Sequence, residues 1–475
     1  MLFNSFHFVF FFIVVTTFYF LLPHKYRWML LLAGSCYFYM VFIPVYILIL
    51  GFTIVIDYFA GIWLEKTEGK KKKWFLIASL IANVGVLAVF KYYNFLNDNL
   101  SIFLNSVGYQ NKIPHLGILL PIGLSFHTFQ AMSYTIEVYR GHQKAERHFG
   151  IYALYVMFYP QLVAGPIERP QNLIHQFYEK HSFEYERVVE GLKMILWGLF
   201  MKLVIADRLA IYVNAVYNNP EHHTGATLAL ATVFFAFQIY CDFAGYSNIA
   251  IGAAKVMGFN LMTNFNRPYF SESISEFWKR WHISLSTWFR DYLYISLGGN
   301  RVSIPRWYFN LFLVFAISGL WHGANWTFII WGALNGFYLV FAIVTEKWRK
   351  RFGKLIWLDH LPRLNSALQI GITFLLACFA WIFFRANTTP DAFYIVKSIV
   401  SLQGPLFIDK TAIGYGFIAI LLLLSIELWQ EWGIRSHLPF KTNHWLTEHL
   451  AYSALVLLIL VLGVFDGGQF IYFQF

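Results

Sequence analysis

Charged residues are scarce in this sequence: Asp, Glu, Lys and Arg make up 13% of its 475 residues, while 58% of the chain is apolar. Soluble domains carry about 25% charged residues, so the composition excludes an ordinary soluble protein and predicts an integral membrane protein. The net charge of +11 does not indicate nucleic-acid binding, because the basic residues lie in short loops between apolar runs.

Cysteine is also rare. Cys36, Cys241 and Cys378 each lie within an apolar run and show no paired or metal-ligand spacing, so neither a disulfide nor a metal site is expected. The chain further lacks a serine nucleophile elbow, a phosphate-cradling glycine loop and a zinc signature. These absences argue against redox and nucleotide-hydrolysing chemistry.

Long apolar runs, in contrast, recur along the whole chain, and about twelve of them are long enough to span a membrane as helices. They cover residues 5–22, 28–43, 45–64, 74–95, 116–139, 188–212, 226–250, 307–324, 326–345, 366–385, 411–431 and 448–465. Lys and Arg collect after the first, third, fifth, ninth and eleventh runs, which predicts that these ends face the inside and both termini the outside. The first run is expected to remain as a span and not to be cleaved as a signal peptide.

Two stretches do not fit simple spans. Residues 149–187 are apolar but broken by Pro160, Pro166 and Pro170, and residues 258–306 alternate aromatic and charged residues densely. Irregular or polar backbone at membrane depth is tolerated only where protein or a water-filled cavity surrounds it. The sequence therefore predicts re-entrant or interfacial helices next to a cavity within an all-α polytopic membrane protein.

Ionisable residues inside apolar runs are candidates for function, because burying them in a bilayer is costly. We expect Asp57 and Glu137 at the membrane interface, and His127 as a structural residue bonded to a neighbouring helix. Asp242 shares a polar stripe with Gln238, Tyr240, Ser247 and Asn248. From the sequence, Asp242 either orients a histidine or lines the cavity.

His322, in the segment SGLWHGANW, is the strongest catalytic candidate. The spacings Gly319-x-x-x-Gly323 and Gly332-x-x-x-Gly336 predict close helix packing around it. A buried imidazole tends to be neutral near pH 7 and can accept a proton from a hydroxyl group as a general base. The alternative is a core histidine bonded to a neighbouring helix.

His282 lies in a stretch rich in aromatic and basic residues that includes Lys279, Arg280 and Arg290. These three cations can receive an anionic, phosphate-bearing donor from the inside face. The alternative is an amphipathic interfacial helix whose basic residues face lipid headgroups.

The ending FDGGQFIYFQF follows the last predicted span. Its large apolar residues are costly to expose to water, so we expect this tail to fold back into the protein. Tyr472 carries its only hydroxyl, and a phenol placed near a neutral imidazole can be deprotonated and act as a nucleophile. Alternatively, Tyr472 is one of several aromatic anchors at the membrane interface.

Several long segments resemble the membrane-bound O-acyltransferase family, and more closely its bacterial branch of alginate O-acetylation membrane proteins. They are PIGLSFHTFQAMSYTIEVYRG, FYPQLVAGPIERP, DFAGYSNIAIGAAKVMGF, NFNRPYFSESISEFWKRWHISLSTWFRDYLYISLGGNR and SGLWHGANWTFIIWGALNG. The resemblance covers nearly the whole chain. The histidine of the family's tryptophan-histidine-glycine motif corresponds to His322, and the earlier histidine of the long aromatic motif corresponds to His282.

The resemblance implies a single domain over residues 1–475, with a motif core at about 116–340. In such a domain a ring of helices surrounds a central funnel from outside and a channel from inside. We further expect Asp242, Asn325 and Gln130 to line the cavity or support it. The resemblance further implies transfer of acetyl from cytosolic acetyl-CoA, without a bound cofactor, to an extracytoplasmic polysaccharide, assisted by a serine-hydrolase-type partner. With such an activity, Tyr472 is a candidate to hold the acyl group as an aryl ester, a relay to the extracytoplasmic acceptor. The expected location is the cytoplasmic membrane of a bacterium, among membrane lipids.

Two other functions stay open. D-alanyl or another acyl group can be transferred to teichoic acid or peptidoglycan, and an acyl carrier protein as donor would distinguish that activity. A proton-coupled transporter is the alternative from another class, but no internal repeat is visible here.

Overall fold

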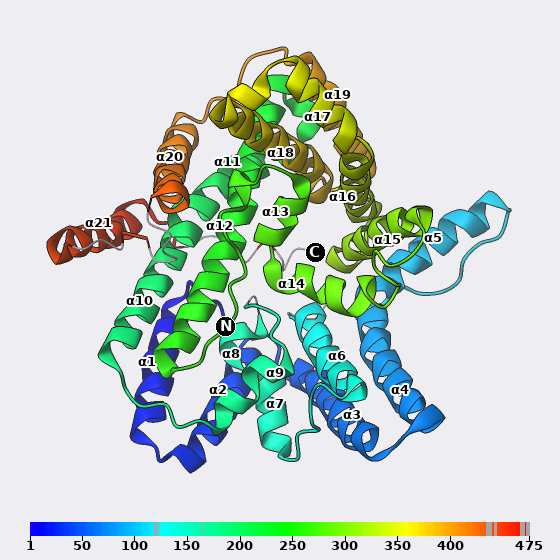
Figure 1. The fold of residues 1–475 in the computed structure, drawn as a ribbon, viewed down its shortest axis with the longest axis vertical. Coiled ribbons are helices and arrows are strands. Elements are labelled where there is room, and N and C mark those ends of the chain that lie inside the picture. The colour runs from blue at the N-terminus through cyan, green and yellow to red at the C-terminus, as the bar shows by residue number, and fades with distance from the viewer. Residues whose placement is uncertain are drawn as a thin grey trace. The chain divides into compact units, whose positions relative to one another are not determined.

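The computed structural model describes residues 1–117, 121, 123–163, 165–433, 439–440, 444–465 and 471, and every regular element among them is a helix (Figure 1). Within this part of the chain, seven helices are long and apolar enough to cross a membrane. They are Pro44–Lys66, Gly69–Ser106, Gly225–Met257, Trp326–Val344, Pro362–Arg385, Lys410–Trp432 and Trp445–Leu462. The prediction of an all-α polytopic membrane protein is thereby confirmed.

The chain forms two compact units, of which the first comprises Met1–Ile195 and Ile249–Met262. Its helices are α1 (Phe6–Leu21), α2 (His24–Met40), α3 (Ile47–Lys66), α4 (Gly69–Leu87), α5 (Tyr93–Ser106), α6 (Leu124–Arg140), α7 (Phe149–Met157), α8 (Tyr159–Leu162), α9 (Pro170–Leu173) and most of α10 (Tyr185–Leu199). The broken stretch at 149–187 thus forms short helices. Pro160 and Pro170 stand in the first turns of α8 and α9, where a missing backbone N–H costs nothing.

Two ionisable residues of this unit are buried within the protein. Asp57 is fully buried between α3 and α4, where Ser79 donates to its carboxylate at 2.6 Å and Asn83 at 2.8 Å. Its place at the membrane interface stays a prediction. His127 is buried, but its Nδ1 bonds the Gly123 carbonyl of its own helix at 3.2 Å and not a neighbouring helix. Asp57 is thus bonded to a second helix, whereas the Nε2 of His127 has no hydrogen-bond partner among the described residues.

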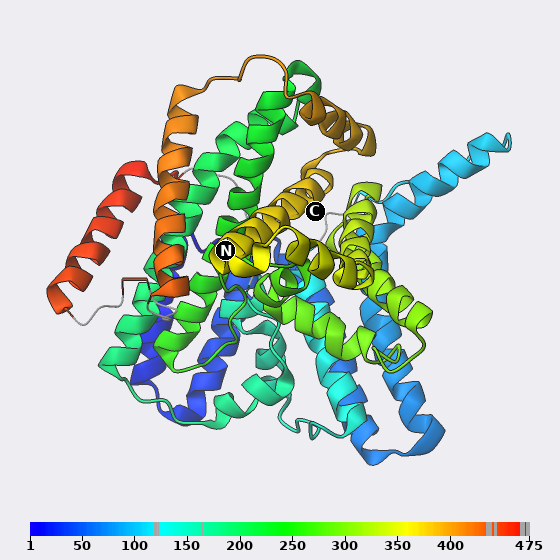
Figure 2. The same ribbon diagram turned by 45° about the horizontal axis from the view of Figure 1, so that its top comes forward.

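The second unit comprises Leu196–Asn248 and Thr263–Phe475. Its helices are α11 (Asp207–Tyr217), most of α12 (Gly225–Met257), α13 (Ile274–Arg280), α14 (Ile283–Trp288), α15 (Ile304–His322), α16 (Trp326–Val344), α17 (Glu346–Leu355), α18 (Pro362–Arg385), α19 (Thr389–Ser401), α20 (Lys410–Trp432) and α21 (Trp445–Leu462). In both views the orange α20 runs beside the green α11 (Figure 2). Trp281, Trp331 and Trp381 are fully buried, and the Trp381 ring centroid lies 5.0 Å from that of Trp281 and 5.8 Å from that of Trp331.

Helices α15 and α16 approach each other through glycine. A Cβ placed on Gly319 would lie 2.2 Å from the Phe328 carbonyl oxygen, and one on Gly332 would lie 2.3 Å from the Phe315 carbonyl oxygen. The close helix packing that the spacing predicted is confirmed at both glycines. It fixes the end of α15, where His322 lies.

Replacing Gly319 with alanine is expected to lower the stability of the protein by about 1 to 3 kcal/mol, because the new methyl group meets backbone that cannot rotate away. Gly371→Ala is the matched control, since no atom of the described residues lies within 4 Å of a Cβ at that position of α18. Thermal unfolding of the detergent-solubilised proteins measures both changes. A Gly319→Ala protein as stable as the control would contradict the close packing.

Candidate active site

His322 is the last residue of α15 and is 4% exposed. Its ring packs edge-on against Trp331 at a centroid distance of 4.8 Å and against Phe384 at 5.6 Å. The aromatic residues come from α16 and α18, so the imidazole sits where three helices meet. This packing fixes the orientation of the ring and keeps bulk water away from it.

A backbone hydrogen bond determines which nitrogen of His322 is basic. Nδ1 lies 2.7 Å from the Ser318 carbonyl oxygen, four residues earlier in the same helix. A carbonyl oxygen only accepts hydrogen bonds, so the neutral ring carries its hydrogen on Nδ1 and leaves the lone pair on Nε2. In the neutral ring, Nε2 is therefore the accepting nitrogen.

His282 is 1% exposed and precedes α14 in a left-handed backbone conformation, with φ of 43°. Its Nδ1 lies 3.1 Å from Asn264 Oδ1, which also accepts the Ser284 backbone N–H at 3.3 Å. Since that N–H can only donate, the orientation of the Asn264 amide is fixed, and its oxygen holds the His282 hydrogen on Nδ1. Asn264 in turn donates to Ser247 Oγ at 3.0 Å.

The environment keeps His282 neutral. The residue lies outside the apolar spans, and burial, with a smaller contribution from His322, lowers its pKa well below the ordinary value. Phe243 packs edge-on against the ring at a centroid distance of 4.5 Å. The second unit thus holds two buried histidines whose carbonyl partners leave Nε2 as the accepting nitrogen.

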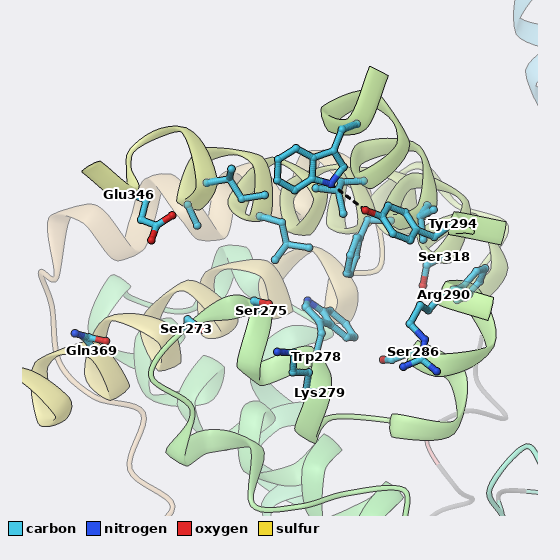
Figure 3. Close-up of a pocket in the computed structure, with 18 of the residues that line it drawn as sticks. Ser273, Ser275, Trp278, Lys279, Ser286, Arg290, Tyr294, Ser318, Glu346 and Gln369 are labelled. Carbon is cyan, nitrogen blue, oxygen red and sulfur yellow. Dashed lines mark hydrogen bonds between the residues drawn. The ribbon is translucent and has the colours of Figure 1, made fainter. Parts of the chain in front are cut away.

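A cavity of about 1000 Å³ lies in the same unit (Figure 3). Trp278 and Lys279 of α13 and Ser286 of α14 line one side, together with Arg290. Figure 3 shows Glu346 of α17 on a different part of the rim. The cavity wall on α15 includes Ser318, whose carbonyl orients His322, so the cavity reaches within one helical turn of the imidazole.

Of the three residues predicted to contact the donor, two line the cavity and one does not. Lys279 and Arg290 line the cavity, and Arg290 Nε donates to Asp291 at 2.7 Å. Arg280 is not among the lining residues, because its guanidinium lies 2.6 Å from Glu276 and 2.9 Å from Glu431. Burial acts to lower the pKa of Arg280, but the two carboxylates together hold it above its ordinary value. The pair with Glu431 ties α13 to α20.

Asp242 belongs to a buried ionic cluster. Lys202 Nζ lies 2.7 Å from Asp242 and 2.8 Å from Asp207, and all three side chains are at most 5% exposed. Asp242 also accepts the backbone N–H of Ile471 at 2.7 Å. Asn264 has the histidine-orienting position that we considered for Asp242.

Ile471 is 3% exposed, so the C-terminal tail returns into the protein at this residue. Tyr472 itself lies outside the described residues. The predicted fold-back is thus observed at Ile471, while the acyl-tyrosine stays a prediction.

The two remaining supporting residues have local partners. Asn325 caps α16 by accepting the Thr327 backbone N–H at 3.0 Å, immediately after the His322 turn. Gln130 belongs to the first unit, where it donates to the Tyr155 carbonyl at 2.5 Å. Both therefore hold backbone in place.

Sequence reasoning missed Asn264, Ser318, Trp278 and Ser286. Asn264 stands in the quoted NFNRPYF segment, but an asparagine so far along the chain from His282 gives no spacing signal. Ser318 acts through its backbone oxygen, which any residue provides. Only the i, i+4 spacing to His322 on a helix could have indicated it.

Known proteins similar to this chain include membrane acyltransferases. The family model described as MBOAT, membrane-bound O-acyltransferase family, matches residues 142–384, which include Lys279, His282, Arg290 and His322. The probable alginate O-acetylase AlgI of Pseudomonas aeruginosa is 39% identical over 406 residues, covering 84% of this chain and 75% of that protein.

Two further relatives have other acceptors in their names. The peptidoglycan O-acetyltransferase of Helicobacter pylori is 35% identical over 406 residues, covering 79% of this chain and 74% of that protein. The teichoic acid D-alanyltransferase of Bacillus subtilis is 29% identical over 289 residues, covering 58% of this chain and 70% of that protein.

Proposed function

Because the chain belongs to the membrane-bound O-acyltransferase family, we propose that it moves acetyl groups from cytosolic acetyl-CoA to an extracytoplasmic polysaccharide such as alginate. The observation that carries the proposal is the buried His322, one turn beyond a cavity lined by Lys279 and Arg290. A neutral base next to a cationic cavity suits an anionic thioester donor. The identity to the probable alginate O-acetylase supports acetyl as the acyl group.

We propose that this activity resides in one domain over residues 1–475. Its twelve predicted spans form a ring around an outer funnel and an inner channel in the cytoplasmic membrane of a bacterium. Each predicted span overlaps a helix of the structure, and seven of the described helices have the length and composition of a membrane span.

In the proposed reaction, His322 Nε2 removes the proton from an acceptor hydroxyl, whose oxygen attacks the acetyl carbonyl carbon. The new C–O bond forms, the C–S bond of the thioester breaks, and the thiolate receives the proton from His322. His282, held neutral by its surroundings, positions the attacking hydroxyl through its Nε2. The first acceptor is the phenol of Tyr472, from which a serine-hydrolase-type partner passes the acetyl group to the polysaccharide.

Asp242, Asn325 and Gln130 take supporting roles in this proposal. Asp242 accepts the Ile471 N–H next to Tyr472 in the sequence, so it helps to hold the tail. Asn325 stabilises the turn after His322, and Gln130 stabilises the first unit. Arg280 stabilises the position of α13 through its ion pairs with Glu276 and Glu431.

Removing the charge of Lys279 or Arg290 is expected to weaken the binding of acetyl-CoA. A hydrogen bond to a charged group contributes about 1.5 to 3 kcal/mol, so Lys279→Gln and Arg290→Gln are each expected to raise the KM for acetyl-CoA by about tenfold or more, with a smaller change in kcat. Arg280→Gln is the comparison: its thermal stability falls while the donor KM stays near the wild-type value. An unchanged KM in Arg290→Gln would favour the interfacial-helix alternative.

The peptidoglycan and teichoic acid relatives define the alternative, in which the acyl group or the polymer differs. Deleting the gene and measuring alkali-labile esters on exported and wall polymers distinguishes these functions. Our proposal predicts loss of acetate esters from an exported polysaccharide and their return with the wild-type gene. Loss of D-alanine esters instead, or no change in any ester, would contradict it.

A further inference from the structure

Helix α17 connects the spans α16 and α18 and has three distinct faces. One face lines the cavity and consists of Glu346, Arg349, Lys350 and Gly353. Contacts within the chain already occupy its charges, because Lys350 Nζ lies 2.6 Å from Glu346 and Arg349 donates to the Ala342 carbonyl at 2.7 Å. This face is part of the site described above.

A second face is apolar. Trp348, Phe352 and Leu355 are 72%, 61% and 75% exposed, and their i, i+4, i+7 spacing places them on one stripe of the helix. Trp357, just beyond the helix end, is 70% exposed. A contiguous apolar surface of this kind marks an interaction site.

The third face is basic. Lys347, Arg351 and Lys354 have the same spacing one position earlier, so their stripe is rotated by about 100° from the apolar one. All three are exposed, and the described part of the chain gives none of their side chains an ion pair. The apolar stripe therefore has unneutralised cations along one edge.

We propose that α17 binds the surface of an anionic phospholipid bilayer. Trp348, Phe352 and Leu355 insert at the boundary between headgroups and acyl chains, and Lys347, Arg351 and Lys354 bind the phosphate headgroups. Lipid is favoured over a protein partner because α17 directly follows one span and is separated from the next by a few residues. A basic flank beside a Trp-containing apolar stripe also complements an anionic interface.

This inference goes beyond the acyltransferase function and does not depend on it. It has one consequence for the site, because the cavity face and the lipid face belong to the same short helix. Lipid bound to α17 therefore fixes one wall of the cavity.

The test uses the full chain in phosphatidylcholine vesicles with Cys36 replaced by serine and a fluorophore on Ile356→Cys, which is 46% exposed; Cys241 and Cys378 are buried. Spin-labelled phosphatidylglycerol or spin-labelled phosphatidylcholine is added at equal mole fraction, and quenching of the fluorophore is measured. Phosphatidylglycerol is expected to be enriched at the label, with each cation contributing up to about fivefold. Lys347→Gln/Arg351→Gln/Lys354→Gln is expected to equalise the two lipids.

A matched control removes three other exposed lysines, Lys70, Lys71 and Lys73, at the start of α4. The control is expected to retain the preference for phosphatidylglycerol at Ile356→Cys. Equal loss in the control, or equal quenching by both lipids in the otherwise wild-type chain, overturns the proposal.

Trp348→Ser/Phe352→Ser is expected to reduce quenching by both lipids. Weak quenching before that change would indicate a protein covering the stripe and would also overturn the proposal.

Discussion

Replacing His322 with alanine or glutamine is expected to reduce acetylation of the exported polymer by about 10²- to 10⁴-fold, the usual contribution of a general base. The reason is the orientation of the His322 ring. The Ser318 carbonyl holds the hydrogen on Nδ1, so Nε2 is the nitrogen that accepts the proton, and neither substitute offers a base there. Ester-bound acetate per sugar, normalised to the amount of protein in the membrane, measures the effect.

His127 provides the matched control. It is 1% exposed, and its Nδ1 also bonds a carbonyl four residues earlier in its helix, so His127→Gln perturbs a comparable environment. We expect the His127→Gln protein to retain most of its activity. Near-normal acetylation by a well-expressed His322→Ala protein would exclude the catalytic role and return His322 to a core residue.

Tyr472→Phe is expected to abolish polymer acetylation, because the change keeps the ring and removes only the oxygen that would carry the acetyl group. The wild-type protein, supplied with acetyl donor and no acceptor, is expected to show an added acetyl group on its C-terminal peptide by mass spectrometry. The added mass should disappear in Tyr472→Phe and in His322→Gln.

Tyr415 is a suitable comparison for the tyrosine. It lies on α20, is 39% exposed, and Tyr415→Phe likewise removes a single hydroxyl. This variant is expected to remain active. Full polymer acetylation by Tyr472→Phe would remove the relay and leave the tail as an anchor at the membrane interface.

The helices and both histidines were predictable because their signals are local. Apolar runs define spans through length and composition alone, and each predicted run overlaps a helix of the structure. The Gly319 and Gly332 spacings predicted a close helix pair, and the clash distances at both glycines confirm it. A buried histidine between glycines is visible in the sequence without knowing its partners.

The polar partners were not predictable, since they depend on contacts between distant segments. Arg280 and Arg290 look equivalent in the sequence, yet of these two only Arg280 pairs with a distant carboxylate among the described residues. That carboxylate is Glu431, more than a hundred positions away, which also pairs with Arg267. Asp242 was the residue considered as the partner of a histidine, but Asn264 has that position beside His282. Asp242 pairs with Lys202 at 2.7 Å instead.

The most direct test of the central claim uses inside-out membrane vesicles that contain the acceptor polymer in their lumen. Labelled acetyl-CoA is added outside, where the cytosolic face is exposed, and alkali-labile label inside the vesicles is counted over time. Wild-type protein is predicted to deliver acetate to the lumen, and His322→Gln to deliver at least about a hundredfold less while still binding acetyl-CoA. Equal delivery by His322→Gln, or delivery only when an acyl carrier protein supplies the acetyl group, would contradict the account.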